Sequence, residues 1–268
     1  MGTPVARPRR QRAQTGRRSK SRWRVWMVFS AICLWSWSPA AFPYRPFDQT
    51  DADVADEGEF ELELGPVGYV REGSDKFLIA PALVGNLGIA QGREIVLEGK
   101  LSTPVNGTSG SQTSLEDVAL SLKQVHRQGS LQDGSGVSVA SECGVLLPGI
   151  HAESGTGARC TGIVSQRWPE ATIHLNAGLA FDREHNWNRI FGGILEGPHE
   201  WTVRPALELI AERNNNGSST NSALAALIWR KQENLSFDLG VRAARTDDQD
   251  VYEIRAGLTW GFSVGKGK

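Results

Sequence analysis

The side chains that could perform chemistry are scattered through this sequence and form no recognised catalytic or metal-binding motif. The five histidines are not spaced as zinc ligands, and no Cys-x-x-Cys pair occurs. The nearest approach to the Gly-x-Ser-x-Gly elbow of serine hydrolases, Gly107 to Ser111, lacks the final glycine and lies in a polar stretch. The sequence therefore predicts no catalytic residue, no metal ligand and no cofactor.

Polar residues instead alternate with apolar ones, and this alternation organises the chain. Between Leu235 and Phe262, two stretches carry apolar side chains at every second position, with charged side chains such as Asp238 and Glu253 between them. A period of two is typical of extended strands with one apolar and one polar face. The chemistry-bearing residues are therefore expected on the polar faces of β-strands.

The alternation predicts about 12 strands that form a single antiparallel, up-and-down, all-β transmembrane barrel. They are expected at residues 59–70, 75–89, 93–103, 114–127, 136–147, 158–168, 171–181, 186–196, 200–212, 221–230, 234–245 and 250–262. Most are about 9 to 13 residues long, which suits a tilted strand that crosses a bilayer. Tight turns alternate with longer polar loops, as in outer-membrane barrels, although the connection from Gln128 to Ser135 is long where a tight turn is expected.

Aromatic residues gather at both ends of the expected strands. The end assigned to the periplasm carries Trp168, Trp201, Trp229, Phe237 and Trp260, and the opposite end carries Tyr69, Phe77, Phe181, Trp187 and Tyr252. Amphipathic rings prefer the two membrane–water interfaces, so the distribution indicates two aromatic belts. It favours a membrane barrel over the alternative of an exported soluble β-sandwich.

If the strands close into a barrel, their polar faces line its lumen. The candidate lumen-lining residues are Glu61, Glu63, Glu98, Lys100, Lys123, Glu142, Arg167, His174, Arg204, Glu208, Asp238, Arg242, Glu253 and Arg255. These side chains either form a polar pathway that selects a solute, or pair across neighbouring strands and fill the interior. At about twelve strands the bore lies between filled small barrels and open porins, so both interpretations stand.

The first 40 residues are expected to be a cleaved signal peptide. Residues 1–24 contain nine basic residues and no acid, and the apolar run from Val25 to Trp37 is shorter than the roughly 20 residues of a membrane-spanning helix. Small residues at Ser38 and Ala40 favour cleavage after Ala40. An uncleaved N-terminal membrane anchor is the alternative.

Removing that basic stretch changes the charge of the protein. Without its nine basic residues, 20 of the 29 lysines and arginines remain against 30 acids. This balance excludes a basic nucleic-acid-binding surface.

Two further segments lie outside the expected barrel, which spans residues 59–262. Residues 41–58 are acidic and interrupted by prolines, so they are expected to form a solvated periplasmic lead-in. Residues 263–268 form a C-terminal extension beyond Phe262.

The two cysteines of the mature chain, Cys143 and Cys160, flank a loop centred near His151 and would lie opposite each other in a symmetric hairpin. A cross-strand disulfide is one interpretation in an oxidising compartment, and two lipid-facing thiols are the other.

Three segments resemble a known family: Glu59 to Tyr69 (EFELELGPVGY), Val145 to Pro148 with the following Glu153 to Gly157, and Glu253 to Trp260 (EIRAGLTW). They are similar to the outer-membrane barrels grouped under the meta-pathway of phenol degradation. The resemblance covers nearly the whole mature chain and its motifs are structural. It implies an outer-membrane barrel that passes aromatic or other small hydrophobic compounds. The C-terminal strand also resembles the signal read by the barrel-assembly machinery.

The sequence therefore favours an outer-membrane channel or transporter for small solutes, with outer-membrane lipid and the assembly machinery as partners. A sealed structural or adhesive surface barrel is the alternative, in which outside loops such as Asn214 to Gly217 would matter more than the lumen. A hydrolase that uses a residue such as His174 is the third class. No feature of the sequence specifies the oligomeric state or the solute.

Overall fold

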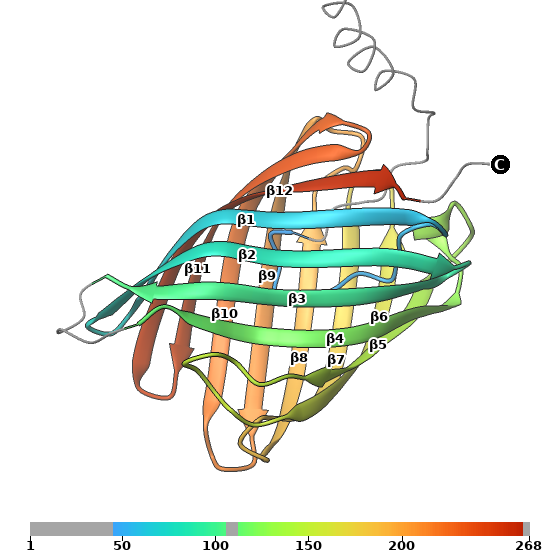
Figure 1. Cartoon of the computed structure of the whole chain (residues 1–268). Coiled ribbons are helices and arrows are strands. Elements are labelled where there is room, and N and C mark those ends of the chain that lie inside the picture. Colours follow the sequence, from blue (N-terminus) through green and yellow to red (C-terminus); the bar gives the residue numbers. More distant parts are fainter. Residues whose placement is uncertain (1–44, 106–111, 265–268) are drawn as a thin grey trace, which may run out of the picture. The chain divides into compact units, whose positions relative to one another are not determined.

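Twelve antiparallel strands pair in sequence order, and the last strand pairs with the first (Figure 1). The computed structural model describes residues 45–105 and 112–264. The strands are β1 (Glu59–Glu72), β2 (Asp75–Ala90), β3 (Arg93–Pro104), β4 (Ser114–Arg127), β5 (Ser138–Leu146), β6 (Gly157–Arg167), β7 (Thr172–Phe181), β8 (Trp187–Glu196), β9 (Val203–Asn214), β10 (Ser219–Gln232), β11 (Leu235–Thr246) and β12 (Gln249–Ser263).

The closed twelve-stranded barrel confirms the predicted fold class, and the expected strands match the observed ones with shifts only at their ends. The predicted signal peptide, the whole Gly107–Ser111 stretch and residues 265–268 lie outside the described residues.

Each strand has one face that is buried in the lumen and one that is exposed on the outside of the barrel. In β7, His174 and Asn176 are 2% and 4% exposed, whereas the intervening Leu175 is 57% exposed. The outward face is made mainly of such large apolar side chains, including Leu209 and Ile254. An apolar surface that encircles a protein requires an apolar surrounding, because contiguous exposed patches of this kind are rare on soluble monomers.

Two prolines in the wall coincide with interruptions of the strand register. The pairing of β2 with β3 shifts between Ile79 and Ala82, on either side of Pro81. The pairing of β1 with β12 shifts between Leu64 and Val67, on either side of Pro66. Proline cannot donate to the ladder, so it is tolerated at such bulges. These two irregularities therefore occur where proline removes a ladder hydrogen bond, whereas the shift between Glu98 and Lys100 involves no proline.

Most of the predicted belt aromatics lie on the outward face near the strand ends. Trp229 and Phe237 pack with ring centroids 5.7 Å apart at the end of the barrel where β1 begins and β12 ends, here called the terminal end. Phe181 and Trp187 pack at 5.3 Å at the opposite end. Phe77 is an exception, because it shares its face of β2 with the buried Ile79 and so belongs to the lumen side.

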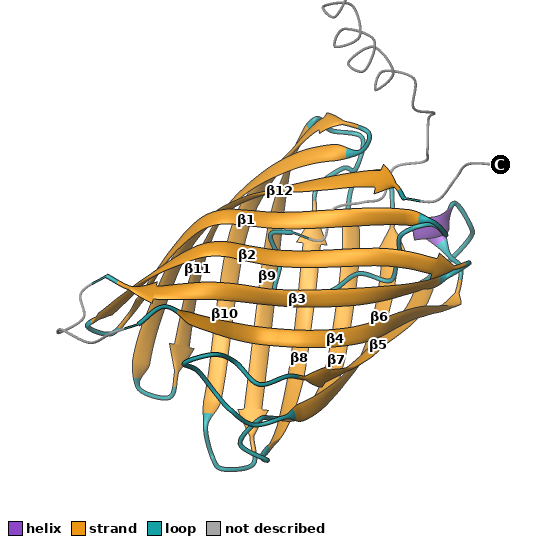
Figure 2. Cartoon of the chain, viewed as in Figure 1, coloured by secondary structure: helices purple, strands orange, loops and turns teal. Residues whose placement is uncertain are grey.

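The connection between β4 and β5, which is long for its end of the barrel, folds back over the terminal mouth. It contains the 3-10 helix η1 (Ser130–Gln132), the purple element in Figure 2. Leu131 of η1 is 5% exposed and packs with Ala52, Ala140 and Ile163. The connection therefore places an apolar side chain inside the barrel. Among the described residues, no helix has the length and apolar character needed to cross a membrane.

Cys143 of β5 and Cys160 of β6 are direct cross-strand neighbours, with Cα atoms 4.0 Å apart. The structure joins Cys143 and Cys160 by a disulfide. Both residues are exposed on the outward face of the wall. The disulfide and the lipid-facing position, which were alternatives from the sequence, therefore coexist at this site.

The acidic stretch before β1 is not a solvated lead-in, and that expectation was wrong for residues 45–58. This N-terminal segment (residues 45–58) runs inside the barrel, where it is drawn in blue behind β1 and β2 (Figure 1). Ala52 is fully buried, and Thr50 and Ala55 are 8% and 5% exposed. The lumen offers this charged segment complementary charges and hydrogen-bond partners, which the composition of the segment alone does not reveal.

We expect an arginine on the outward face to destabilise the barrel in a bilayer. Val241 is 53% exposed near the middle of β11, and Val241→Arg should reduce the free energy of unfolding by about 2–4 kcal/mol, because the bilayer centre cannot solvate the charge. Denaturant titration of the protein in lipid vesicles measures this. Glu170→Arg, at an exposed turn, is the matched control and should change stability by less than about 0.5 kcal/mol. Equal effects of the two variants would contradict a lipid-facing position for Val241.

Candidate functional site

The N-terminal segment follows the inner wall of the barrel and contacts successive strands in turn. Its first described residue, Arg45, pairs with Asp238 of β11 at 3.2 Å. Thr50 then exchanges hydrogen bonds with Asn176 of β7, and Ala55 donates its N–H to Glu94 of β3 at 2.7 Å. The segment thus passes around the lumen from β11 to β3 before it enters β1.

Lumen side chains satisfy the backbone of this segment. Glu208 of β9 accepts the N–H groups of both Asp48, at 3.1 Å, and Gln49, at 2.7 Å. Ser165 of β6 accepts the N–H of Ala52 at 3.0 Å. Buried backbone donors need partners, and a segment without regular secondary structure has no paired strand to supply them. The lumen therefore supplies the hydrogen bonds that a strand would obtain from its neighbours.

Two lumen glycines leave room for the segment. A Cβ atom added at Gly88 of β2 would collide with the backbone of Ala55 and Asp56, and one added at Gly257 of β12 would collide with the Arg45 guanidinium. A side chain at Gly88 would force the segment away from the wall, because the atoms that it would meet are backbone atoms. At Gly257 the guanidinium is the flexible end of a side chain and can shift, so of these two positions the close approach of the segment requires glycine at Gly88.

The aspartates of the segment pair with arginines and lysines of the wall. Asp48 lies 2.6 Å from Arg255 and 3.0 Å from Arg242, and Asp51 lies 3.0 Å from Lys123. Burial opposes ionisation of both aspartates, but these cations overcome it and hold the pKa of Asp48 and of Asp51 below the usual value. The segment is therefore bound as an anion in a cationic part of the lumen.

The connection between β4 and β5 holds the middle of the segment. Gln132 donates its Nε2 group to the carbonyl of Ala52 at 2.8 Å and to Asp53 at 2.9 Å. Burial and the nearby Asp51 raise the pKa of Asp53 to about 6. Asp53 thus differs from the two paired aspartates in that docking favours its protonated form.

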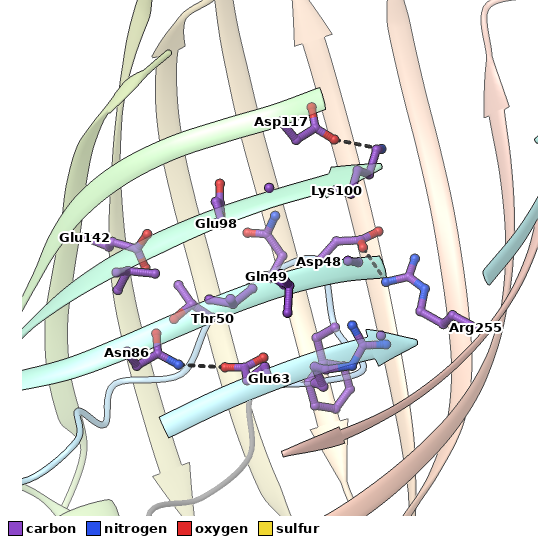
Figure 3. A pocket seen from close by; sticks show the side chains of 18 of the residues that line it. Asp48, Gln49, Thr50, Glu63, Asn86, Glu98, Lys100, Asp117, Glu142 and Arg255 are labelled. Carbon is purple, nitrogen blue, oxygen red and sulfur yellow. Dashed lines mark hydrogen bonds and ion pairs between the residues drawn. The ribbon is translucent and has the colours of Figure 1, made fainter. Parts of the chain in front are cut away.

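A cavity of about 530 Å³ lies beside the segment in the lumen (Figure 3). It extends from Gln49 and Asp51 of the segment to Asp117 and Glu212, near the opposite end of the barrel. Charged side chains project into it from several strands, with the Lys100–Asp117 pair on one side and the Arg255–Asp48 pair on another (Figure 3). The arrangement forms a polar chamber of the size that small-molecule sites have.

The structure places all fourteen predicted lumen residues on the inner face. Nine of them line the cavity, namely Glu61, Glu63, Glu98, Lys100, Lys123, Glu142, Arg242, Glu253 and Arg255. The other five are buried or half-buried against the segment or one another, namely Arg167, His174, Arg204, Glu208 and Asp238. Pairing across neighbouring strands, which was one of the two interpretations of the lumen charges, occurs only partly between β11 and β12, because Arg242 reaches Glu253 at 4.0 Å whereas Asp238 pairs with Arg45 of the segment.

Several residues of the site were missing from the sequence-based candidates. Glu94 binds both the segment and Lys123, and Arg159 of β6 bridges Glu98 and Glu142 at 2.7 and 3.2 Å. Glu94 lies on the same face of β3 as Glu98, four residues before it, so the alternation contained the signal. No comparable signal marked the N-terminal segment, because it has no period.

A buried polar chain joins Ser165, His174 and Glu196. The Oγ atom of Ser165 lies 2.8 Å from Nδ1 of His174, whose Nε2 lies 3.0 Å from Glu196, and Arg204 pairs with the same carboxylate at 2.8 Å. These residue types occur in hydrolase triads. Here, however, Ser165 is fully buried and its oxygen already accepts the N–H of Ala52. The chain therefore supports the segment and leaves no space for a substrate at the serine.

The described residues contain no group of three or more His, Cys, Asp or Glu side chains placed to hold a metal ion. For the chain as a whole, the absence of a metal site stays a prediction from the sequence.

Solved structures of outer-membrane proteins share this fold. An outer-membrane channel from Pseudomonas putida F1 is similar with a TM-score of 0.58 and 8% identity, over 81% of this chain and 100% of that chain. The KdgM porin is similar with a TM-score of 0.50 and 13% identity, over 75% and 99%. No protein-family model matches the sequence, and no curated protein matches it. At such low identities the likeness shows the fold alone, which is that of outer-membrane barrels.

Removing the Glu208 carboxylate should release the first part of the segment. Glu208→Ala leaves the N–H groups of Asp48 and Gln49 without their acceptor. Hydrogen bonds to charged groups contribute about 1.5–3 kcal/mol, so amide exchange in residues 48–50 should accelerate at least about tenfold. Hydrogen exchange with mass spectrometry measures this, and Glu200→Ala, on an exposed turn, should leave the rate unchanged. Unaltered exchange in Glu208→Ala would show that this carboxylate does not hold the segment.

Docking of the segment should respond to pH through Asp53. The pKa of Asp53 in the docked segment lies above the ordinary value of 3.8. Protonation of Asp53 therefore stabilises docking fully below about pH 3.8, and this stabilisation is lost as the pH rises through about 6. Asp53→Asn keeps an oxygen that can accept from Gln132 but cannot ionise. Relative to the wild type, amide exchange in residues 52–55 should be several-fold slower at about pH 7.5 and unchanged at about pH 3, below the ordinary pKa of 3.8. Equal exchange of the two proteins at the higher pH would contradict this.

Proposed function

We propose that this protein is an outer-membrane channel for small solutes, narrowed by its own N-terminal segment. The observation that carries the proposal is the charged cavity of about 530 Å³ inside a closed barrel with an apolar outer face. A barrel of twelve strands has a bore wide enough to leave such a space, and a soluble protein would not need the apolar exterior.

Three features support a location in the outer membrane. The outward face is apolar along the strands, the aromatic residues lie near the strand ends, and the sequence begins with a stretch typical of an exported precursor. The alternating last strand with Trp260 and Phe262 is the type of segment that the barrel-assembly machinery recognises. The partners in this proposal are outer-membrane lipid, the assembly machinery and a small solute.

The chamber is suited to a solute of about one ring in size. Its walls combine charges with apolar side chains such as Phe47, Ile79 and Val84, and small-molecule sites usually have a few polar groups on apolar walls. The resemblance to the phenol meta-pathway barrels adds aromatic compounds as the solute class. The proposed role is passage rather than chemistry, because the segment covers the triad-like chain of Ser165, His174 and Glu196 that the described residues contain.

A sealed structural barrel is the second candidate, and the same segment is the observation that favours it. Residues 45–58 occupy the lumen with ion pairs to several strands, which would close the barrel if the segment never moved. The two candidates therefore differ in whether ions and solutes pass through the protein while the segment is bound or displaced.

Single-channel recording in planar bilayers separates these candidates. The full protein should conduct weakly, and deletion of residues 46–55 should raise the conductance several-fold, because the freed bore approaches that of an open small barrel. A variant with Asn215 and Asn216 replaced by alanine, in an exposed loop at the opposite end, is the control and should conduct as the wild type does. If both the wild type and the deletion variant were silent, the channel proposal would fail and the sealed barrel would stand.

A further inference from the structure

The charges around the cavity do not balance. Eleven carboxylates and seven basic side chains line it, so acids exceed bases by four. An excess of one sign in a confined space with apolar walls attracts ions of the opposite sign and repels others. The excess alone does not define a site, because the surplus carboxylates could be spread evenly around the wall.

The bases of the cavity are already paired. Every one of the seven has a carboxylate oxygen within 4.0 Å, and several have two: Lys123 with Asp51 and Glu94, Arg159 with Glu98 and Glu142, and Arg255 with Asp48 and Glu253. A second negative group would therefore find no free cation in the described part of the lumen. An anionic ligand would have to displace one of these carboxylates.

The surplus of acid is located on β1. Glu61 and Glu63 stand two positions apart on the same face, are 5% and 1% exposed, and have no ion-pair partner among the described residues. Glu63 accepts the Asn86 amide at 2.9 Å, as the dashed line in Figure 3 shows. The Oε2 atom of Glu61 has no hydrogen-bond partner in the described structure. Leaving a buried carboxylate oxygen without a partner is costly, so the site lacks a donor.

The wall beside these carboxylates is apolar. Val84 is directly opposite Glu63 in the register of β1 and β2, and Val96 is opposite Asn86 in the register of β2 and β3. Both valines line the cavity together with Ile79. A ligand at this position would therefore meet two carboxylates at one end and aliphatic side chains along its body.

We propose that the cavity binds a small organic cation, with an ammonium or guanidinium group at Glu61 and Glu63 and an apolar body against Val84 and Val96. An ammonium group carries three donors and no acceptor, which is the complement of the unpaired Glu61 oxygen. The proposal deepens the channel function, on which it rests for the route by which the cation enters. The binding site itself does not depend on conduction.

A series of three ligands of equal size and different charge tests the site. Benzylammonium, benzyl alcohol and benzoate share one ring, so isothermal titration of the full protein in detergent compares charge at nearly constant shape. Benzylammonium should bind at least about tenfold more tightly than benzyl alcohol, and benzoate most weakly. Equal binding of the three compounds, or no binding of benzylammonium, would overturn the proposal.

Neutral variants assign the effect to β1. Glu61→Gln and Glu63→Gln should each weaken benzylammonium binding by about tenfold or more and leave benzyl alcohol unaffected. Glu233→Gln, at an exposed turn, is the matched control and should bind as the wild type does. Heat-modifiable gel migration checks that each variant is folded. If a glutamate variant fails to fold, the ligand series on the wild-type protein still decides the question.

Reversal potentials in a KCl gradient distinguish this proposal from the channel proposal. If the wild type conducts and prefers cations, and if this preference falls in Glu61→Gln, the result supports both the channel and the cation site. Conduction without preference, together with equal binding of the three ligands, overturns the cation site and leaves the channel. A silent protein that still binds benzylammonium overturns the channel and leaves the site.

Discussion

The structure depends on the hydrogen bonds and ion pairs between a charged lumen and the irregular segment that lies within it. Glu208, Asn176, Ser165 and Glu94 provide acceptors for backbone N–H groups that have no strand neighbour. Lys123 and Arg255, in turn, receive their counter-ions partly from Asp51 and Asp48 of the segment. Because unpaired charges and donors in a confined interior are costly, neither the lumen nor the segment is complete without the other.

The barrel makes this possible because closure and alternation separate two environments. The period of two sends most large apolar side chains outward and places most charged side chains in the middle of the strands on the lumen face. Twelve strands therefore concentrate charge from much of the barrel into one space. The segment uses part of that charge, and the remainder surrounds the cavity, where the Oε2 atom of Glu61 has no hydrogen-bond partner among the described residues.

The separation of an apolar outer face from a charged lumen explains which parts of the structure the sequence predicts. Strand positions and inward-facing residues such as Glu208 and Asp238 follow directly from alternation, because a one-residue slip would place them in lipid. The N-terminal segment could not be recognised in this way, since five acids and two prolines in residues 41–58 are also typical of a solvated chain. Its position depends on partners far away in the sequence, such as Asp238 for Arg45. A glycine on a lumen face, such as Gly88 of β2, is a local sign in the wall that something passes close to it.

The width of the path through the barrel depends on whether the segment occupies the lumen of the protein in the membrane. Oxidative cross-linking in membranes tests this directly, because a Cβ atom at Gly192 would lie 2.6 Å from Cγ of Gln49. With the native cysteines replaced by serine, the pair Gln49→Cys and Gly192→Cys should form an intrachain disulfide readily. The control pair Gln49→Cys and Glu170→Cys, whose second member lies on an exposed turn, should not. Failure of the first pair to form the disulfide, or equal cross-linking of both pairs, would contradict a segment held inside the barrel.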